Sequence, residues 1–421
     1  MRIVDAFCTQ VSSGFFRDDQ QAIRLGAGHD GFLYSGTPTT PGFSKIREAG
    51  VAFSILLILD DGQIAVGDCA EVQYAGTGGR AALLSRGLVL DQLEEVVLPE
   101  LIGREVDGFR ELAEWVEGLR IRSEPLLTAL RYGVSQAILH GASLAARTTM
   151  AEVVQREYGI EGEITAVPIF AQTGDDRYLN VDKMIVKEVD ALPHGLINEV
   201  DSKLGQDGEI LLDYVRWVTG RIRSLRRDET YLPRLHLDTY GTIGLAFDSD
   251  LARITDYLCE LKAAAGAHEL WIEHPIDAGS RDAQVETYVA LRNRLRKSGV
   301  EVALVVDEWC NTLEDIDVFT AADAADVIHV KTPDLGGVNK TVEALLMVRQ
   351  RGLRTYCGGT CNETDLSSRV STHVAMACHA DQMLAKPGMG VDEGVMIVRN
   401  EMLRTLALVK RTKTLADEAK R

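Results

Sequence analysis

The pattern of hydrophobic and polar residues divides the chain into two parts. Apolar residues run through 51–59 and 63–69, and Asp60, Asp61 and Gly62 between them are typical of a hairpin turn. From about residue 85 to 157 the apolar residues recur at helical spacing. Antiparallel strands followed by helices predict an α+β domain over residues 1–160.

Eight short apolar runs follow, and helical stretches separate most of them. They are 164–172, 191–197, 234–238, 269–275, 302–308, 325–332, 353–360 and 383–388. Buried strands that alternate with helices predict a parallel sheet, and eight such strands close a barrel. The alternative, an open doubly wound sheet, is disfavoured because no G-x-G-x-x-G follows the first strand.

The predicted fold class is therefore α/β, a (β/α)8-type TIM barrel preceded by an α+β domain. We expect the N-terminal domain at residues 1–160, the catalytic barrel at 161–400 and a C-terminal helical tail at 401–421.

Composition excludes several classes of function. The net charge of −18 argues against nucleic-acid binding, because phosphates require basic surfaces. The longest apolar run, 55–59, is too short to cross a bilayer, and the N-terminus lacks the features of a signal peptide. Seven scattered cysteines without a C-x-x-C pair indicate reduced thiols. We expect a soluble, cytoplasmic protein with no nucleic-acid or membrane partner.

Three acidic residues fall at the C-terminal ends of three consecutive predicted strands, where barrel active sites are built: Asp238, Glu273 and Asp307. Any one of them could simply cap a helix or join a surface ion pair. Together they would repel one another unless a cation lies between them, and three oxygen ligands suit Mg²⁺. Glu308 should point to the opposite face of its strand because side chains alternate.

The next predicted strand places His329 and Lys331 two residues apart, on the same face. A lysine beside a divalent cation is pushed toward its neutral form, which a general base requires. The alternatives are a Lys331 that extends to solvent from the strand edge, and a His329 that serves only as a hydrogen-bonded structural residue.

The seventh predicted strand ends in Gly358, Gly359 and Thr360, and Cys361 follows it. The glycines would let the backbone approach a ligand closely, although a tight turn accounts for them nearly as well. Thr360 offers hydroxyl and amide donors. Cys361 would need an adjacent base to act as a nucleophile, so we expect it to serve in packing or in a backbone contact to substrate.

Three further segments carry candidate residues or loops. Gln172 ends the first predicted barrel strand and can donate to a carboxylate. His194 lies in the second strand, where a lone histidine is more often structural. The glycine-rich segment 76–80 lacks the Lys-Ser/Thr of a phosphate-binding loop, and it predicts a flexible loop or lid.

With these residues identified, the chain resembles the methylaspartate ammonia-lyases of the enolase superfamily over nearly its whole length. The resemblance rests on GAGHDGF (26–32), AQTGDDRY (171–178), WCNTLED (309–315), VKTPDLGGVN (330–339), YCGGTCNET (356–364) and LAKPGMGVDEG (384–394). It implies an N-terminal capping domain on the barrel, a homodimer, and Mg²⁺ with K⁺ as a possible activator. It also implies a small-molecule amino-acid substrate: reversible elimination of ammonia from (2S,3S)-3-methylaspartate to mesaconate, in glutamate fermentation.

The resemblance also implies roles for individual residues. The three strand-end acids would bind Mg²⁺, and Lys331 would remove the C3 proton, giving an enolate (aci-carboxylate) that Mg²⁺ stabilises. His194 would lie on the opposite side of the substrate, as an electrostatic partner or as the base for the other C3 epimer. The substrate-binding positions would be Gln172, His194, His329, Thr360 and Cys361.

The chain departs from the family at one of these positions, since the family usually has glutamine in place of His329. An imidazole donates and accepts in a different geometry from an amide, and it can become charged. We therefore expect activity to fall more sharply on acidification than in a His329→Gln variant.

Two rival functions are less consistent with the sequence. Another enolase-superfamily enzyme, such as a racemase, dehydratase or cycloisomerase acting on a carboxylate, often carries a Lys-x-Lys doublet on the second strand, which this sequence lacks. A non-catalytic binding or scaffold barrel is expected to have lost the acids or the base, and all four are present here.

Overall fold

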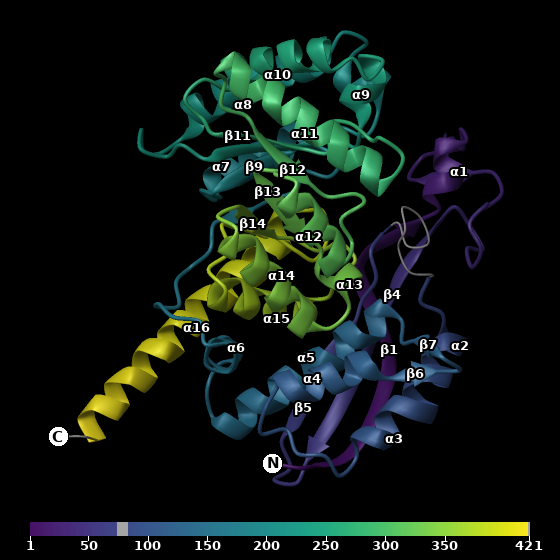
Figure 1. Cartoon of the computed structure of the whole chain (residues 1–421), viewed down its shortest axis with the longest axis vertical. Coiled ribbons are helices and arrows are strands. Elements are labelled where there is room, and N and C mark those ends of the chain that lie inside the picture. Colours follow the sequence, from purple (N-terminus) through teal and green to yellow (C-terminus); the bar gives the residue numbers. More distant parts are fainter. Residues whose placement is uncertain (74–82, 420–421) are drawn as a thin grey trace.

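The computed structural model describes residues 1–73 and 83–419, which fold into two parts that lie against each other (Figure 1). In Figure 1 the long strands β1 and β4 and the helices beside them form the lower part, and the barrel with its helices forms the upper part. Segment 76–80, predicted to be a loop or lid, lies outside the described residues.

The first part is built on an antiparallel sheet with strand order β1-β4-β5. Ile58 pairs with Ile64 across the predicted turn, so the hairpin is confirmed. The elements of this part are β1 (Ile3–Asp18), α1 (Gln20–Arg24), β2 (Gly28–Asp30), β3 (Leu33–Ser35), β4 (Arg47–Leu59), β5 (Ile64–Cys69), α2 (Arg86–Val89), a π-helical stretch (Leu90–Val97), α3 (Leu98–Leu101), α4 (Arg110–Gly118), β6 (Arg120–Ile121), β7 (Glu124–Pro125), α5 (Thr128–Ala146) and α6 (Met150–Tyr158).

Helix α5 packs directly on strand β5. A Cβ at Gly67 would overlap the backbone of Gly133, and a Cβ at Gly133 would overlap Cys69, so the two glycines permit backbone contact. The apolar pattern extends further toward the N-terminus than the helix does, because Leu126 is buried while its backbone is still outside α5. Pro125 suits the first turn of a helix, but it pairs instead with Arg120 in the short β6–β7 ladder.

All eight predicted barrel strands are confirmed. Within the described residues they form a closed barrel of parallel strands in chain order, in which β15 pairs with β8. They are β8 (Ile169–Phe170), β9 (Ala191–His194), β10 (Arg234–Asp238), β11 (Leu270–Glu273), β12 (Ala303–Val306), β13 (Val327–Val330), β14 (Arg354–Cys357) and β15 (Gln382–Leu384). The architecture is therefore the predicted TIM barrel.

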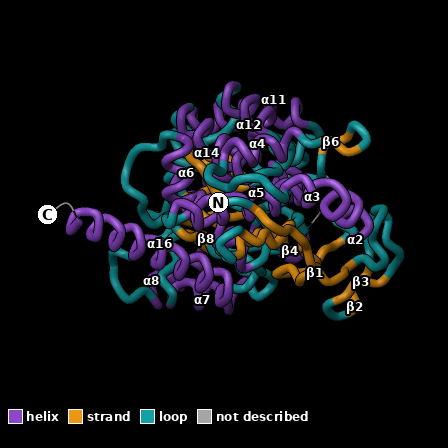
Figure 2. The backbone as a smooth tube through the Cα atoms, turned by 90° about the horizontal axis from the view of Figure 1, so that it is seen from below, coloured by secondary structure: helices purple, strands orange, loops and turns teal. Residues whose placement is uncertain are grey.

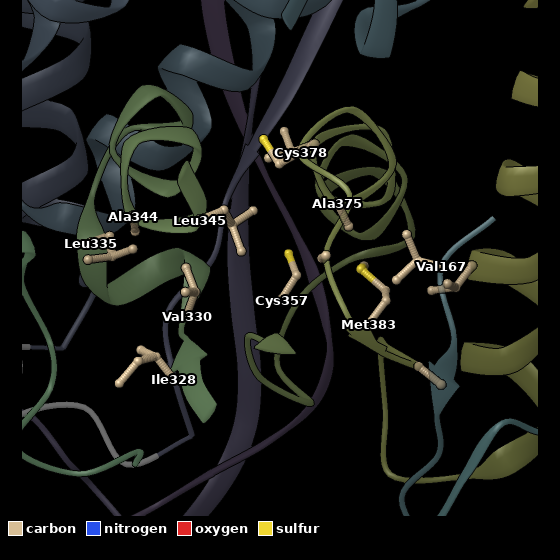
Figure 3. Packing of buried hydrophobic residues seen from close by; sticks show 14 of the residues in the cluster. Val167, Ile328, Val330, Leu335, Ala344, Leu345, Cys357, Ala375, Cys378 and Met383 are labelled. Atoms are coloured by element: carbon tan, nitrogen blue, oxygen red, sulfur yellow. The ribbon is translucent and has the colours of Figure 1, made fainter. Parts of the chain in front are cut away.

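Strand alternation sorts the barrel side chains into an inner and an outer layer. A buried inner cluster includes Phe170, Trp271 and Tyr356. The neighbouring residues along the strands face the helices. Figure 3 shows Ile328, Val330, Cys357 and Met383 among residues of the surrounding helices, such as Leu345 and Ala375. Both faces of each strand are thus largely buried, and the acidic residues of the barrel mouth lie at or just after the strand ends.

Helices alternate with the strands around the barrel. They are α7 (Arg177–Val186), a π-helical turn (Val200–Leu204), α8 (Glu209–Leu225), α9 (Thr242–Ala246), α10 (Leu251–Ala265), α11 (Arg281–Ser298), α12 (Leu313–Ala321), α13 (Thr332–Leu335), α14 (Val338–Gln350), α15 (Asp365–Ala377) and α16 (Val391–Ala419). Helix α16 is continuous through residues 400 and 401, and its C-terminal turns project from the body of the molecule (Figure 2). In the described chain, helices with the length and apolar character needed to span a membrane are absent.

Candidate active site

One buried pocket at the C-terminal ends of the barrel strands collects every residue that the sequence predicted for the site. The lining residues include Gln172, His194, Asp238, Glu273, Asp307, His329, Lys331, Thr360 and Cys361. They come from seven strands or from the segments that follow them, so that only the closed barrel brings them together.

The acidic side chains are arranged differently from a simple triplet. Among the described residues, Glu273, Asp307 and His329 each offer a ligand atom, and these atoms lie within 4.8 Å of one another. Asp238 lines the same pocket outside this group. Its Oδ2 lies 3.5 Å from His194 Nε2, and its Oδ1 accepts a hydrogen bond from Tyr240 N at 3.2 Å.

Glu273 is the most enclosed of the acids. His236 Nε2 lies 2.9 Å from its Oε2, and His329 Nδ1 lies 2.6 Å from its Oε1. Burial alone would raise the pKa of Glu273, but the interactions with His329 and His236, hydrogen bonds from both rings included, outweigh burial and hold the pKa well below its usual range. The carboxylate therefore stays ionised deep in the barrel.

His236 is fully buried inside the barrel and contacts Glu273 there. Its ring stacks on Phe170 with centroids 4.2 Å apart, and its Nδ1 lies 2.8 Å from Gln382 Nε2. Burial lowers the pKa of His236, so the ring stays neutral. A neutral ring that accepts from Gln382 carries its proton on Nε2 and donates it to Glu273.

His329 makes contacts on both sides of its ring. The Gly359 amide donates to Nε2 at 3.4 Å, so the ring proton lies on Nδ1 and faces Glu273. Nδ1 is also 3.4 Å from Asp307 Oδ1, and the ring packs on Tyr356 with centroids 4.2 Å apart. His329 therefore lies in direct contact with two of the three predicted metal ligands, Glu273 and Asp307.

Lys331 and His194 lie on opposite sides of the barrel mouth, because β9 and β13 are four strands apart in an eight-stranded barrel. Lys331 Nζ lies 2.5 Å from Asp307 Oδ1, so the lysine points into the mouth and not to solvent. His194 ends β9 with a φ of +69°, a conformation that non-glycine residues rarely adopt and that is enriched at functional sites.

Thr360 and Cys361 join the barrel to the N-terminal part. Gln73 N donates to Thr360 Oγ1 at 3.3 Å, and the Cys361 thiol lies 3.4 Å from Gln73 Oε1. Burial raises the pKa of Cys361 to about 12, so the thiol stays protonated at neutral pH. This agrees with the predicted packing role and argues against a nucleophile.

One predicted orientation was wrong. Glu308 was expected to point away from the site, but it lines the pocket and lies 3.1 Å from His274. Strand β12 ends at Val306, so strict alternation no longer applies to Asp307 and Glu308.

The sequence analysis did not predict six further residues that line the pocket. They are Val72, Gln73, Tyr240, Tyr356, Leu384 and Met389. Tyr356 and Leu384 lie within predicted strands. Their inward-facing positions near the strand ends could have identified them as pocket residues. Gln73 is supplied by the N-terminal part, and no spacing in the sequence points to it.

Comparison with known proteins follows the same two-part organisation. Residues 1–159 match the family model for the N-terminus of methylaspartate ammonia-lyase, and residues 163–411 match the model for its C-terminus. The chain is 52% identical to the methylaspartate ammonia-lyase of Clostridium tetanomorphum, over 98% of this chain and 100% of that protein. It is 49% identical to the methylaspartate ammonia-lyase of Citrobacter amalonaticus, over 97% of this chain and 99% of that protein.

Solved structures agree with these matches. The magnesium complex of β-methylaspartase from Clostridium tetanomorphum superposes with a TM-score of 0.94 at 52% identity, covering 98% of this chain and 100% of that one. The Citrobacter amalonaticus enzyme containing (2S,3S)-3-methylaspartic acid gives a TM-score of 0.96 at 49% identity, covering 97% and 100%. Muconate lactonizing enzyme from Pseudomonas fluorescens, at 16% identity and a TM-score of 0.59 over 90% and 87%, shares the fold alone. This chain therefore belongs to the methylaspartate ammonia-lyase family.

Proposed function

We propose that this protein is a Mg²⁺-dependent carbon–nitrogen lyase that reversibly eliminates ammonia from (2S,3S)-3-methylaspartate to give mesaconate. The observation that carries the proposal is a buried pocket in which three strand-end carboxylates lie beside a lysine. Its support is the 52% identity to a methylaspartate ammonia-lyase whose structure is a magnesium complex.

The donor set fits a magnesium ion. Asp238, Glu273 and Asp307 offer carboxylate oxygens from adjacent strands, and such hard ligands suit Mg²⁺. All three side chains are buried, and buried carboxylates require a compensating positive charge. We assign these residues as the metal ligands. When bound, Mg²⁺ neutralises the charge that builds on the substrate carboxylate as the neighbouring carbon loses its proton.

Residues on two opposite sides of the substrate then take part in the reaction. Lys331 takes the proton from C3 as general base, after which ammonia leaves C2 and the double bond forms. His194 lies across the mouth from Lys331, as an electrostatic partner or as the base for the other C3 epimer. We assign substrate contacts to Gln172, His194, His329, Thr360 and Cys361, which line the same pocket.

We further propose the finer features that accompany this activity in the family. Residues 1–160 form a cap on the barrel at 161–400, and residues 401–421 form the C-terminal tail. The protein works as a cytoplasmic homodimer in glutamate fermentation, with K⁺ as a possible activator of the Mg²⁺ enzyme. Gel filtration tests the homodimer, and activity measured with and without K⁺ tests the activation by K⁺.

Lys331→Ala tests the assignment of the base. We expect no detectable absorbance from the conjugated alkene when the variant is incubated with (2S,3S)-3-methylaspartate and Mg²⁺, a loss of roughly 10²–10⁴-fold or more. Mg²⁺ binding, followed by calorimetry, should remain because the three acids are unchanged. Turnover by the variant would refute the role of Lys331.

A panel of acids tests the function itself. Wild-type protein should produce the alkene from methylaspartate, whereas a product from a different carboxylic acid would favour a racemase, dehydratase or cycloisomerase. No reaction across the panel would favour a scaffold role.

A further inference from the structure

A fully buried ion pair lies directly behind the pocket. The side chains of Lys386 and Glu363 are both 0% exposed, and Lys386 Nζ lies 2.7 Å from Glu363 Oε1. Lys386 Nζ also donates to the carbonyl of Gly358 at 2.6 Å and to Thr332 Oγ1 at 3.3 Å, so all three ammonium protons are used.

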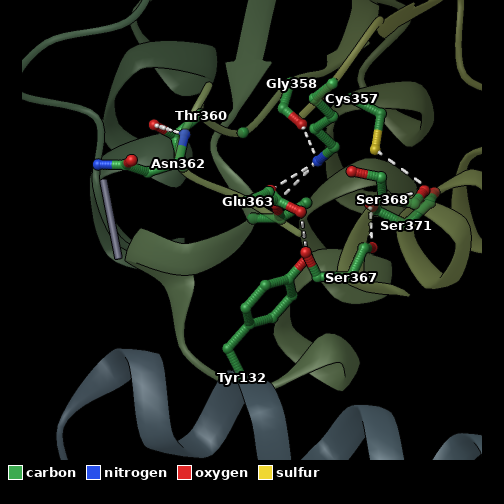
Figure 4. Close-up of polar contacts among 12 residues, drawn as sticks. Tyr132, Cys357, Gly358, Thr360, Asn362, Glu363, Ser367, Ser368 and Ser371 are labelled. Atoms are coloured by element: carbon green, nitrogen blue, oxygen red, sulfur yellow. Dashed lines mark hydrogen bonds and ion pairs between the residues drawn. The ribbon is translucent and has the colours of Figure 1, made fainter. Parts of the chain in front are cut away.

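The carboxylate of this pair is equally well satisfied. Thr332 Oγ1 donates to Glu363 Oε1 at 2.6 Å, and the Tyr132 hydroxyl donates to Oε2 at 2.9 Å. Burial raises the pKa of Tyr132 well above its usual value, so this hydroxyl keeps its proton. Figure 4 shows Tyr132 extending from its helix toward Glu363, with Gly358 and Thr360 on the neighbouring loop.

Stability alone does not account for such a pair. Removing two full charges from water is costly, and well-packed apolar residues of similar size often stabilise a protein as well or better. A buried pair retained next to a catalytic pocket therefore suggests that its value lies in fixing a conformation.

The pair ties together the ends of three neighbouring strands. Thr332 follows Lys331 at the end of β13, Gly358 follows β14, and Lys386 comes two residues after the end of β15. A single ammonium group therefore binds the side-chain hydroxyl of Thr332, the residue after the lysine base, and the backbone carbonyl of Gly358, two residues before Thr360.

Two glycines transmit this constraint to the pocket. A Cβ at Gly359, whose φ is +133°, would overlap Glu363 Oε1 and Lys386 Nζ, so this backbone rests on the ion pair. A Cβ at Gly358 would overlap the His329 ring, so the other side of the same backbone rests on His329. The dipeptide is thus enclosed between the ion pair and the His329 ring, and Gly359 also lines the pocket.

We propose that the Lys386–Glu363 pair is a positioning element. It holds the Gly358–Gly359 backbone in contact with His329 and thereby fixes the positions in which His329 and Thr360 contact the substrate. Neither residue of the pair lines the pocket, so the pair acts through the loop and not on the reacting atoms. The kinetic consequence rests on the proposed lyase function, whereas the immobilisation of the loop does not.

The test uses a double variant, Lys386→Met with Glu363→Gln. Lys386→Met alone would leave a buried unpaired carboxylate and risks unfolding, whereas the double change removes both charges and keeps most of the volume. We expect kcat/KM for methylaspartate to fall roughly 10–100-fold, with KM raised and kcat lowered, because a small displacement of contact groups is sufficient for such a loss. Mg²⁺ affinity in the absence of substrate should be unchanged.

A matched control removes another ion pair at the opposite end of the barrel. Arg292 Nε lies 2.8 Å from Asp326 Oδ1, just before β13 begins, and Arg292 is largely buried. Arg292→Met with Asp326→Asn should lower the melting temperature without changing kcat/KM per folded molecule. If the two double variants lose activity only in proportion to their unfolded fraction, the pair is merely structural and the proposal is wrong.

Hydrogen exchange provides a readout that does not depend on activity. The amides of residues 358–362 should exchange about tenfold faster in the Lys386→Met, Glu363→Gln variant than in the wild type or the control. Unchanged exchange would overturn the positioning role whatever the reaction proves to be. Faster exchange in a protein that never releases ammonia from methylaspartate would uphold the immobilisation and reject the proposed function.

Discussion

At the scale of single residues, His329 makes two hydrogen bonds of the kind that a glutamine amide also makes. It donates from Nδ1 to Glu273 and accepts the Gly359 amide at Nε2, which is one donor and one acceptor on opposite sides, as in glutamine. The difference is that a ring that gains a second proton can no longer accept from Gly359.

This difference gives a pH prediction. Acidification should lower the kcat/KM of the wild type more steeply than that of His329→Gln, because the amide keeps its acceptor at every pH. The measurement is kcat/KM for methylaspartate between about pH 5 and 8, the range in which an ordinary imidazole changes charge. Superimposable profiles of the two proteins would show that protonation of His329 has no part in the reaction.

The positions of the charged residues followed most directly from the sequence. Asp238, Glu273, Asp307 and Lys331 stood at the ends of apolar runs, where barrel enzymes place their reactive groups. Their pairing was not predictable. Whether a carboxylate faces His194, as Asp238 does, or His329, as Glu273 does, depends on side-chain directions that spacing does not specify.

At the scale of elements, Glu71 links the end of β5 to the start of α2. Its Oε2 accepts from Leu84 N at 2.5 Å, and Arg17 lies 3.6 Å from its Oε1. Burial raises the pKa of Glu71 to about 7, and the hydrogen bond and Arg17 only partly offset this effect.

A stability prediction follows from the raised pKa. Between about pH 4.5 and 7 the folded state binds a proton at Glu71 that the unfolded state has lost, so this group makes stability fall as pH rises. Glu71→Gln keeps the acceptor for Leu84 and lacks this dependence. We expect the variant to match the wild type near pH 5 and to exceed it by about 1–3 kcal/mol near pH 8.

Urea unfolding at the two pH values measures this difference, with Glu48→Gln as the control. Burial works against ionisation of Glu48, but hydrogen bonds from Ser44 and Arg17 hold its pKa at about 2, so its contribution is already complete at pH 5. The control should therefore lose similar amounts of stability at both pH values. A constant difference between Glu71→Gln and the wild type would contradict the prediction.

The elements themselves were largely predictable from periodicity. All eight barrel strands appeared as short apolar runs because both faces of each strand are buried. The error in orientation arose at the end of an element. Glu308 lies beyond the end of β12, where the alternation of side chains along the strand no longer fixes their direction.

At the scale of the whole molecule, residues 360–364 bind the barrel to the N-terminal part. Gly14 N donates to the Glu363 carbonyl at 3.0 Å, Asn362 Nδ2 donates to the Phe16 carbonyl at 3.2 Å, and Thr364 Oγ1 donates to Asp68 Oδ2 at 2.5 Å. These contacts are buried or partly buried, so the two parts should unfold together.

Calorimetry tests this coupling. We expect one thermal transition for the wild type, with equal calorimetric and van 't Hoff enthalpies. Asp68→Ala removes the acceptor of Thr364 and should cost about 1.5–3 kcal/mol, the range for hydrogen bonds to charged groups. It should either lower the transition temperature or separate the two parts. Two separate transitions in the wild type would show that the interface does not couple them.

The contacts between the N-terminal part and the barrel are the least predictable feature from the sequence. Strands and helices follow from local patterns. The contribution of Gln73 to the pocket depends instead on its contact with Thr360, which lies 287 residues later in the chain.

The enclosed Gly358–Gly359 dipeptide has a consequence for attempts to broaden substrate scope. A randomised library would yield almost no folded members at these two codons, since either side chain would collide with the protein itself. Diversity is better directed to the neighbouring strand β15 and the segment after it, where Leu384 and Met389 line the pocket.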